Sequence, residues 1–172
     1  MSPGKSLRNL MKKEGMVTAP GAYDGLTAKL IRQAGFNCVY MSGGSTSSAF
    51  GYPDYGLLTM SEMVANASRI ADAVDVPVIS DADNGYGNEL NVFRTIRAFE
   101  KAGVAGVHIE DQVFPKRCGH LDDKALVSLD DYLAKIRAAA DARQSPDFII
   151  IARTDSRAKL GFAEAVKRCN AA

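Results

Sequence analysis

The sequence of 172 residues predicts an α/β fold of the (β/α)₈ barrel type, with this chain covering about the first five strand–helix units. Three observations lead to this prediction. Five short runs rich in β-branched residues recur along the chain, amphipathic helical patterns lie between them, and polar side chains follow nearly every run. Strand and helix in alternation form parallel βαβ units. Because no linker or shift in composition divides the chain, we expect a single domain over residues 1–172.

The five apolar runs are predicted to be strands buried on both faces, because each is too short for a buried helix. Their sequences are, in chain order, MVTAPGAY from Met16, CVYMSGG from Cys38, VPVISDAD from Val76, AGVHIED from Ala105 and FIIIARTD from Phe148.

Three of the segments between these runs repeat apolar residues at helical spacing. The shared faces comprise Leu26, Leu30, Ile31 and Ala34 in the first segment, Val92, Ile96 and Phe99 in the second, and Leu129, Tyr132, Leu133, Ile136 and Ala140 in the third. Two helices are predicted to end at Ala34-Gly35 and Ala102-Gly103, since a glycine just past a helix readily takes the left-handed conformation. The last twelve residues, GFAEAVKRCNAA, are amphipathic and predict one more helix.

Two arrangements of βαβ units have to be compared, a doubly wound sheet and a barrel. A doubly wound sheet is expected to carry a glycine-rich phosphate loop, G-x-G-x-x-G, at the start of a helix. The segment 84–87, NGYG, lacks the third glycine, and the two nearby aspartates would repel a phosphate. In a barrel, the polar residues after the strands converge on the mouth where active sites lie. We therefore favour the barrel, of which a complete copy usually needs about 250 residues.

The composition excludes several classes of partner. Lys plus Arg number 21 against 20 for Asp plus Glu, so nothing indicates nucleic-acid binding. No apolar run approaches the roughly 18 residues of a membrane span, and the first residues do not resemble a secretory signal. The three cysteines are far apart and lack C-x-x-C spacing, which argues against disulfides and structural zinc. We predict a cytoplasmic protein.

Carboxylates at two neighbouring strand ends indicate a metal site. Asp81 and Asp83 follow one strand, and Glu110 ends the next. Three carboxylates at one mouth would repel one another unless a cation lay among them, and oxygen ligands suit Mg²⁺ or Mn²⁺ better than zinc. The alternative is that the two aspartates cap a turn while Glu110 is solvated.

Other polar residues at strand ends are candidates for anion binding. The small residues Ser42, Gly43 and Gly44 would let backbone N–H groups approach an anion, although the same sequence is common in turns. The guanidinium of Arg153 could bind a substrate carboxylate or pair with Asp155. We interpret His108, inside a strand, as a core residue whose hydrogen bonds are satisfied.

Cys118 is the candidate reactive group. It lies in the loop after the fourth strand, with Lys116, Arg117 and His120 beside it. Cationic neighbours make a thiol a better nucleophile or proton donor. The other two cysteines, Cys38 and Cys169, are interpreted as packing residues.

Five motifs of this sequence resemble the isocitrate lyase and phosphoenolpyruvate mutase superfamily. They are YMSGG, DADNGYG, HIEDQ, KRCGH and ARTD, and their order and spacing match across essentially the whole chain. Within the superfamily, the sequence is most similar to the 2-methylisocitrate lyase and 2,3-dimethylmalate lyase group. The segment GYPDYGLLTMSEM resembles the dimethylmalate and petal-death type in particular.

The resemblance implies a (β/α)₈ barrel, usually a homotetramer that exchanges its last helix between subunits. It implies a Mg²⁺-dependent lyase that splits a 2-hydroxy di- or tricarboxylate into a 2-oxo acid, such as pyruvate, and a carboxylate. The resemblance implies that Asp81 and Asp83 bind the metal, while Glu110 and Asp54 contact the metal's waters. It implies that Cys118 donates a proton and that Tyr40 helps to transfer the hydroxyl proton. The implied substrate-binding residues are Ser42, Gly43, Gly44, Gly119, His120 and Arg153.

Two other functions remain open at this point. The chain could be an oxaloacetate decarboxylase or a phosphonate-forming mutase of the same superfamily, branches in which the family lacks the cysteine at the position of Cys118. It could also be a non-catalytic fragment, because the proteins it resembles continue through three more strands.

Overall fold

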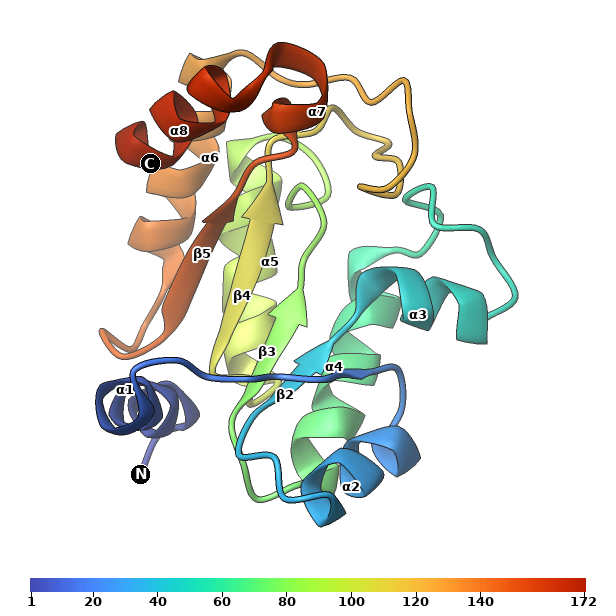
Figure 1. The fold of residues 1–172 in the computed structure, drawn as a ribbon, viewed down its shortest axis with the longest axis vertical. Helices are drawn as coiled ribbons and strands as arrows, with labels where there is room; N and C mark the ends of the chain where they lie inside the picture. Colours follow the sequence, from blue (N-terminus) through green and yellow to red (C-terminus); the bar gives the residue numbers. More distant parts are fainter.

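The computed structural model describes all 172 residues and contains one parallel sheet of five strands (Figure 1). The strands are β1 (Gly21–Ala22), β2 (Val39–Met41), β3 (Val78–Asp81), β4 (Gly106–Glu110) and β5 (Ile149–Arg153). Each strand pairs in parallel with the next one in the sequence, which gives the order β1-β2-β3-β4-β5. This sequential order is that of a barrel wall, whereas a doubly wound sheet reverses its strand order at a switch point. The doubly wound alternative is therefore excluded.

Four of the eight helices lie on one side of the sheet. Figure 1 shows the long helices α4 (Met60–Ala73), α5 (Glu89–Lys101) and α6 (Leu129–Ala142) behind the strands, with α2 (Gly25–Gln33) near β1. The helix α1 (Pro3–Glu14) lies at the end of the sheet where the strands begin. At the opposite end, α3 (Gly43–Ala49) follows β2, and α7 (Ser156–Leu160) and α8 (Phe162–Ala171) follow β5.

The main core fills the space between the sheet and the helices behind it. It consists of 21 buried residues, among them Val78, Val107, Phe99 and Tyr132. A smaller cluster of Leu7, Cys38 and Ala105 lies under α1. The prediction that Cys38 is a packing residue is confirmed.

Local sequence signals define the helix ends. Thr59 caps α4 and Asn88 caps α5, and in each case the side chain three residues later completes a capping box. Gly35 and Gly103 have φ of 94° and 87°, the left-handed conformation predicted for them after α2 and α5.

The predicted apolar face of α2 is only partly its buried face, because Ile31 packs against the core while the two leucines do not. Leu26 and Leu30 are 66% and 54% exposed, whereas Ala28 is completely buried. The helix contacts β1 and α4. Ala28 and Ile31, rather than the leucines, face the core. A similar error of one position occurs in α6, where Ala139 is buried and Ala140 is exposed.

Burial on both faces is confirmed for β4 but not for β5. All five residues of β4 are buried, while every residue of β5 is only partly buried or exposed. The difference arises because β5 pairs with β4 alone, so its other edge and its near face in Figure 1 have no covering element. The predicted packing role of Cys169 is also wrong, since Cys169 is exposed on α8. None of the helices combines the length and apolarity needed to cross a membrane.

Candidate active site

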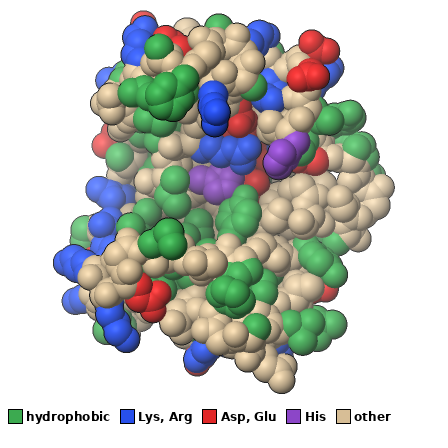
Figure 2. All heavy atoms as spheres, in the orientation of Figure 1, with side chains coloured by type: hydrophobic (Ala, Val, Ile, Leu, Met, Phe, Trp, Pro, Cys, Tyr) green, Lys and Arg blue, Asp and Glu red, His purple; other side chains and the backbone are tan.

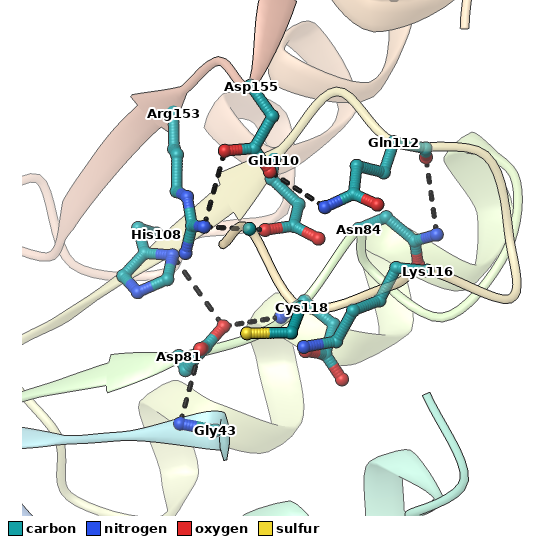
Figure 3. A network of polar contacts seen from close by, with 12 residues as sticks. Gly43, Asp81, Asn84, His108, Glu110, Gln112, Lys116, Cys118, Arg153 and Asp155 are labelled. Atoms are coloured by element: carbon teal, nitrogen blue, oxygen red, sulfur yellow. Dashed lines mark hydrogen bonds and ion pairs between the residues drawn. The ribbon is translucent and has the colours of Figure 1, made fainter. Parts of the chain in front are cut away.

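The carboxyl ends of the strands bring most of the predicted site residues together. Asp81, Glu110 and Arg153 are the last residues of β3, β4 and β5, and Tyr40 lies in β2. Figure 2 shows both histidines of the chain on one face beside cationic and acidic side chains, and Figure 3 shows the same region from close by. This mouth is where barrel enzymes carry their active sites.

Asp81 is the centre of the network. Its Oδ2 accepts hydrogen bonds from the Gly43 amide and from Tyr40 Oη, both at 3.2 Å. Its Oδ1 accepts one from the Asp83 amide at 2.9 Å. A Cβ on Gly43 would lie 2.5 Å from Asp81 Oδ2, so only glycine permits this approach. The predicted anion cradle is thus partly used within the protein, because the Gly43 amide binds Asp81.

The neighbouring residues of that predicted cradle have different surroundings. Ser42 caps α3 by accepting a hydrogen bond from the Ser45 amide at 3.3 Å. Gly44 lies against Asp54, where an added Cβ would be 3.1 Å from Oδ2. The structure therefore brings Asp54 to the same mouth as Asp81 through the helix that begins at Gly43.

Lys116 is a central residue of the site that the sequence pattern did not identify as such. Its ammonium lies 2.5 Å from Asp54 Oδ1 and 2.9 Å from Asp83 Oδ1, and its side chain is 5% exposed. A cation does lie among the predicted carboxylates, but it is a side chain of the chain itself. The only sequence signal was its place two residues before Cys118, since Asp54 is 62 residues away.

A second group of charges surrounds Arg153. Its Nη2 lies 3.4 Å from Glu110 Oε2 and 3.3 Å from Asp155 Oδ1. The structural pair with Asp155 is therefore formed, and about a third of the guanidinium side chain stays exposed. Gly119 lies against this guanidinium, where an added Cβ would be 2.5 Å from Nη2.

His108 is not a satisfied core residue, and that prediction is wrong. The side chain is buried, but it points from β4 into the site (Figure 3). Its Nε2 lies 2.7 Å from Tyr40 Oη, while its Nδ1 has no hydrogen-bond partner and lies 3.6 Å from Asp81 Oδ1. Inward-facing positions of a barrel strand look like core positions in a sequence, which explains the error.

Cys118 lies in the loop that closes over these charges. Lys116 on one side of it contacts Asp83, and Gly119 on the other side lies against Arg153, so the segment that carries the thiol is held between the two groups. Its Sγ is 3.7 Å from His120 Nδ1. An adjacent open cavity of about 570 Å³ is lined by Tyr23, Ser42, Gly44, Ser45, Ser48, Ala49 and His120.

Burial and mutual repulsion separate the acids by protonation state. Burial and the charge of Asp81 raise the pKa of Asp83 to about 7. Burial raises the pKa of Glu110 to about 8. Burial also acts on Asp81, but His108 and Lys116 outweigh it and lower the Asp81 pKa. Near neutral pH, Asp81 is therefore ionised, Asp83 is partly ionised and Glu110 is largely protonated.

The cluster suits a hydrated divalent cation better than a fully coordinated one. No group of three or more His, Cys, Asp and Glu side chains is close enough together to hold a metal by itself. Buried polar atoms without a well-aligned hydrogen bond nevertheless gather here, namely Asp83 Oδ1, Tyr86 Oη, His108 Nδ1 and Glu110 Oε1. Mg²⁺ usually keeps several waters and takes few carboxylate ligands, and such waters would satisfy these atoms. The residues present therefore fit the implied metal.

We expect the free energy of unfolding, measured without metal, to depend on pH through Glu110. Its pKa rises from the usual 4.5 to about 8 on folding, so its contribution to stability is full below pH 4.5 and is lost as the pH rises to 8. The stability of Glu110→Gln relative to the unmodified protein should increase over this range, by up to about 1.4 kcal/mol per pH unit. Urea unfolding in EDTA at pH 5, 6, 7 and 8 measures this. If the difference in free energy of unfolding between Glu110→Gln and the unmodified protein stays constant with pH, the pKa of Glu110 does not rise on folding and the prediction is wrong.

Comparisons with known proteins agree with this geometry. The family model described as phosphoenolpyruvate phosphomutase matches residues 7–172. The 2,3-dimethylmalate lyase of Eubacterium barkeri is 52% identical over 169 residues, which are 98% of this chain and 58% of the relative. The 2-methylisocitrate lyase of Aeropyrum pernix is 48% identical over 166 residues, 96% of this chain and 53% of the relative.

Solved structures show the same likeness. A crystal structure of 2,3-dimethylmalate lyase has a TM-score of 0.94 at 45% identity and covers 99% of this chain and 58% of that one. A phosphonopyruvate hydrolase in complex with oxalate and Mg²⁺ has a TM-score of 0.91 at 35% identity, with 99% and 59% covered. This chain thus spans little more than half the length of these relatives, and it has the fold of about the first five units of their (β/α)₈ barrel. By sequence and by fold, the chain belongs to the phosphoenolpyruvate mutase and isocitrate lyase superfamily.

Proposed function

We propose that this protein is a Mg²⁺-dependent carbon–carbon lyase that cleaves a 2-hydroxy di- or tricarboxylate, of the methylisocitrate or dimethylmalate kind, into a 2-oxo acid and a carboxylate. The observation that carries the proposal is the position of Cys118 in the loop over the site, where Lys116 contacts the acid cluster and Gly119 lies against Arg153. A lyase of this type needs an acid that protonates the leaving carbanion, next to a site that holds the carbonyl product. The lyases among the relatives support the same reaction class.

The metal would be held by Asp81 and, through its waters, by Asp83, Glu110 and Asp54. Bound there, Mg²⁺ or Mn²⁺ would act as a Lewis acid on the hydroxyl and carbonyl oxygens of the substrate. Asp81 is the ionised acid of the cluster and is fixed by three hydrogen bonds, so it is the side chain best suited to direct contact.

Arg153 and the residues near Ser42 would bind the substrate's carboxylates. The exposed part of the Arg153 guanidinium faces the mouth between Glu110 and Gly119, where it can form a charge-assisted fork with a carboxylate. Ser42, Gly44 and His120 line the adjoining cavity, which has room for the rest of the substrate.

Two groups would move protons. Burial and Asp81 raise the pKa of Tyr40, so its phenol stays neutral. Its hydrogen, which the resting site directs to Asp81 Oδ2, would turn to the neutral His108 Nε2 at 2.7 Å while the phenol oxygen takes the substrate's hydroxyl proton. The Cys118 Sγ–H would give its proton to the carbanion carbon. After release, His108 would lose a proton to water and Cys118 would regain one from water, so that no net proton is gained or lost over the cycle.

Thermal unfolding with and without Mg²⁺ and oxalate tests the proposal, since oxalate mimics the enolate of a 2-oxo acid. A ligand that binds only the folded protein raises the unfolding midpoint. We expect a cooperative transition whose midpoint rises by several degrees only when Mg²⁺ and oxalate are both present, with succinate as the control anion. A midpoint indifferent to both would contradict the proposal and support a non-catalytic fragment. The homotetramer implied by the family resemblance and the cytoplasmic location expected from the composition stay predictions.

A further inference from the structure

Gln112 forms a pair of hydrogen bonds with the backbone of the residue that precedes Cys118. It lies two residues after the end of β4 and is 1% exposed. Its Nε2 donates to the Arg117 carbonyl at 2.8 Å, and the Arg117 amide donates to its Oε1 at 3.0 Å. The carboxamide therefore binds both backbone polar groups of one residue, as a neighbouring antiparallel strand would do.

The carboxamide is itself held by a residue that follows the next strand, β5. Gln112 Nε2 donates its second hydrogen to Asp155 Oδ2 at 2.7 Å, an interaction drawn in Figure 3. Asp155 is fixed in turn by its own amide, which donates to Asp111 Oδ1 at 2.8 Å. The donors and acceptor of the Gln112 side chain are thus all used, and they connect the Cys118 loop to the end of β5.

The loop has little apolar packing of its own. Val113, Phe114 and Leu121 are 40%, 51% and 41% exposed, so burial of these side chains contributes little to holding it. At its base, Gln112 and Leu126 form an isolated antiparallel bridge. Between that bridge and Cys118, polar contacts such as those of Gln112 and Lys116 must fix the loop.

We propose that Gln112 is a positioning residue, which holds the Arg117–Cys118 segment closed over the acid cluster. Only a carboxamide can donate to the Arg117 carbonyl and to Asp155 while it accepts from the Arg117 amide. The consequence for proton donation rests on the proposed lyase function, because it needs Cys118 to reach the substrate. The closed state of the loop can be measured without turnover.

Tryptic cleavage of the Arg117–Cys118 bond tests the proposal directly, because trypsin cuts after Arg117 and must free the backbone groups that Gln112 binds. We expect Gln112→Met, which is similar in size but has no strong hydrogen-bonding group, to raise the rate of this cleavage by roughly tenfold or more. Gln112→Glu keeps the acceptor but loses both donated bonds, so it should give an intermediate or equal increase. The matched control is Gln33→Met at an exposed position, which should leave the rate unchanged.

Two further measurements separate positioning from a general loss of stability. The thermal midpoint of each variant and its cleavage after Arg143, outside the loop, should change little while cleavage after Arg117 rises. If cleavage at both sites rises together, or if neither rises, Gln112 does not position the loop. Should Gln112→Met not fold, Gln112→Glu decides the question by the same comparison. The cleavage assay does not depend on a lyase reaction. If Gln112→Met releases the loop but the unmodified protein does not bind Mg²⁺ and oxalate, the positioning role is supported and only the proposed function is contradicted.

Discussion

Cys118→Ser is expected to lower the turnover of carbon–carbon cleavage by about 10²–10⁴-fold, the usual contribution of a general acid. A serine hydroxyl is a far weaker acid than a thiol, and it does not donate its proton readily to a carbanion. The oxygen is close in size to the sulfur, and Cys118 is only partly buried, so the fold should be unaffected. The measurement is the rate of 2-oxo acid release from 2-methylisocitrate and from 2,3-dimethylmalate.

The binding of Mg²⁺ and oxalate provides the internal control for this variant. Oxalate resembles the enolate of the expected 2-oxo acid product, and its binding would require no proton from Cys118. Its affinity should therefore change less than about threefold in Cys118→Ser. Cys169→Ser is the matched control for removal of a thiol, because Cys169 is exposed on α8. It should keep full turnover.

Other results for Cys118→Ser would indicate either a different function of the protein or a different role of the thiol. Unchanged turnover of oxaloacetate or phosphoenolpyruvate in Cys118→Ser would favour a decarboxylase or phosphonate-forming mutase, because the sequence resemblance links this cysteine to the lyases. Equal loss of turnover and of oxalate binding would mean that the thiol supports the site rather than donates a proton.

The order of the strands could be predicted from the sequence because four of the five strands lie in strong apolar runs, although β1 forms only at Gly21–Ala22 of its predicted run. Short β-branched runs with helical patterns between them require parallel units, and the polar residues after each run indicate one mouth. The exact burial of each face could not be predicted. Leu26 and Leu30 satisfy a helical period, yet Ala28 faces the core, because the period does not reveal which side of a helix has a neighbour.

The site was predictable to the extent that its residues lie at strand ends. Asp81, Glu110 and Arg153 are terminal residues of their strands, so their convergence follows from the parallel sheet. Lys116 could not be placed in this way. Its partner Asp54 lies in another loop 62 residues away, and only the closed loop brings the two together. The role of His108 could not be predicted either, because the sequence does not show which face of β4 points into the site. His108 lies on that face, and its Nδ1 has no hydrogen-bond partner there.

A buried ion pair attaches α8 to the site, and we expect its loss to lower the free energy of unfolding strongly. Arg168 Nη1 lies 3.0 Å from Asp111 Oδ2, and the two side chains are 5% and 0% exposed. Asp111 also accepts hydrogen bonds from Thr154 Oγ1 and from the Asp155 amide. The pair therefore connects α8 to the segments that follow β4 and β5.

We expect Arg168→Met to lower the free energy of unfolding by about 3–5 kcal/mol, because it leaves the Asp111 carboxylate buried without its cation. Urea denaturation at pH 7 measures the change. The matched control is Lys167→Met, one residue earlier, whose ion pair with Glu164 spans 3.5 Å and has a lysine side chain that is 64% exposed. Its removal should change the stability by no more than about 0.5 kcal/mol.

The double variant Asp111→Asn/Arg168→Met distinguishes loss of charge compensation from loss of packing. The carboxamide introduced at position 111 would carry no charge, and its carbonyl could still accept from the Asp155 amide. If the cost of Arg168→Met comes from the uncompensated carboxylate, the double variant should be more stable than Arg168→Met alone. A double variant that is less stable than either single one would show that the two side chains contribute mainly through their contacts with Val127 and Thr154. In the expected case, the charge of Arg168 keeps Asp111 able to hold Asp155, and through Asp155 it supports both Arg153 and Gln112 at the mouth of the barrel.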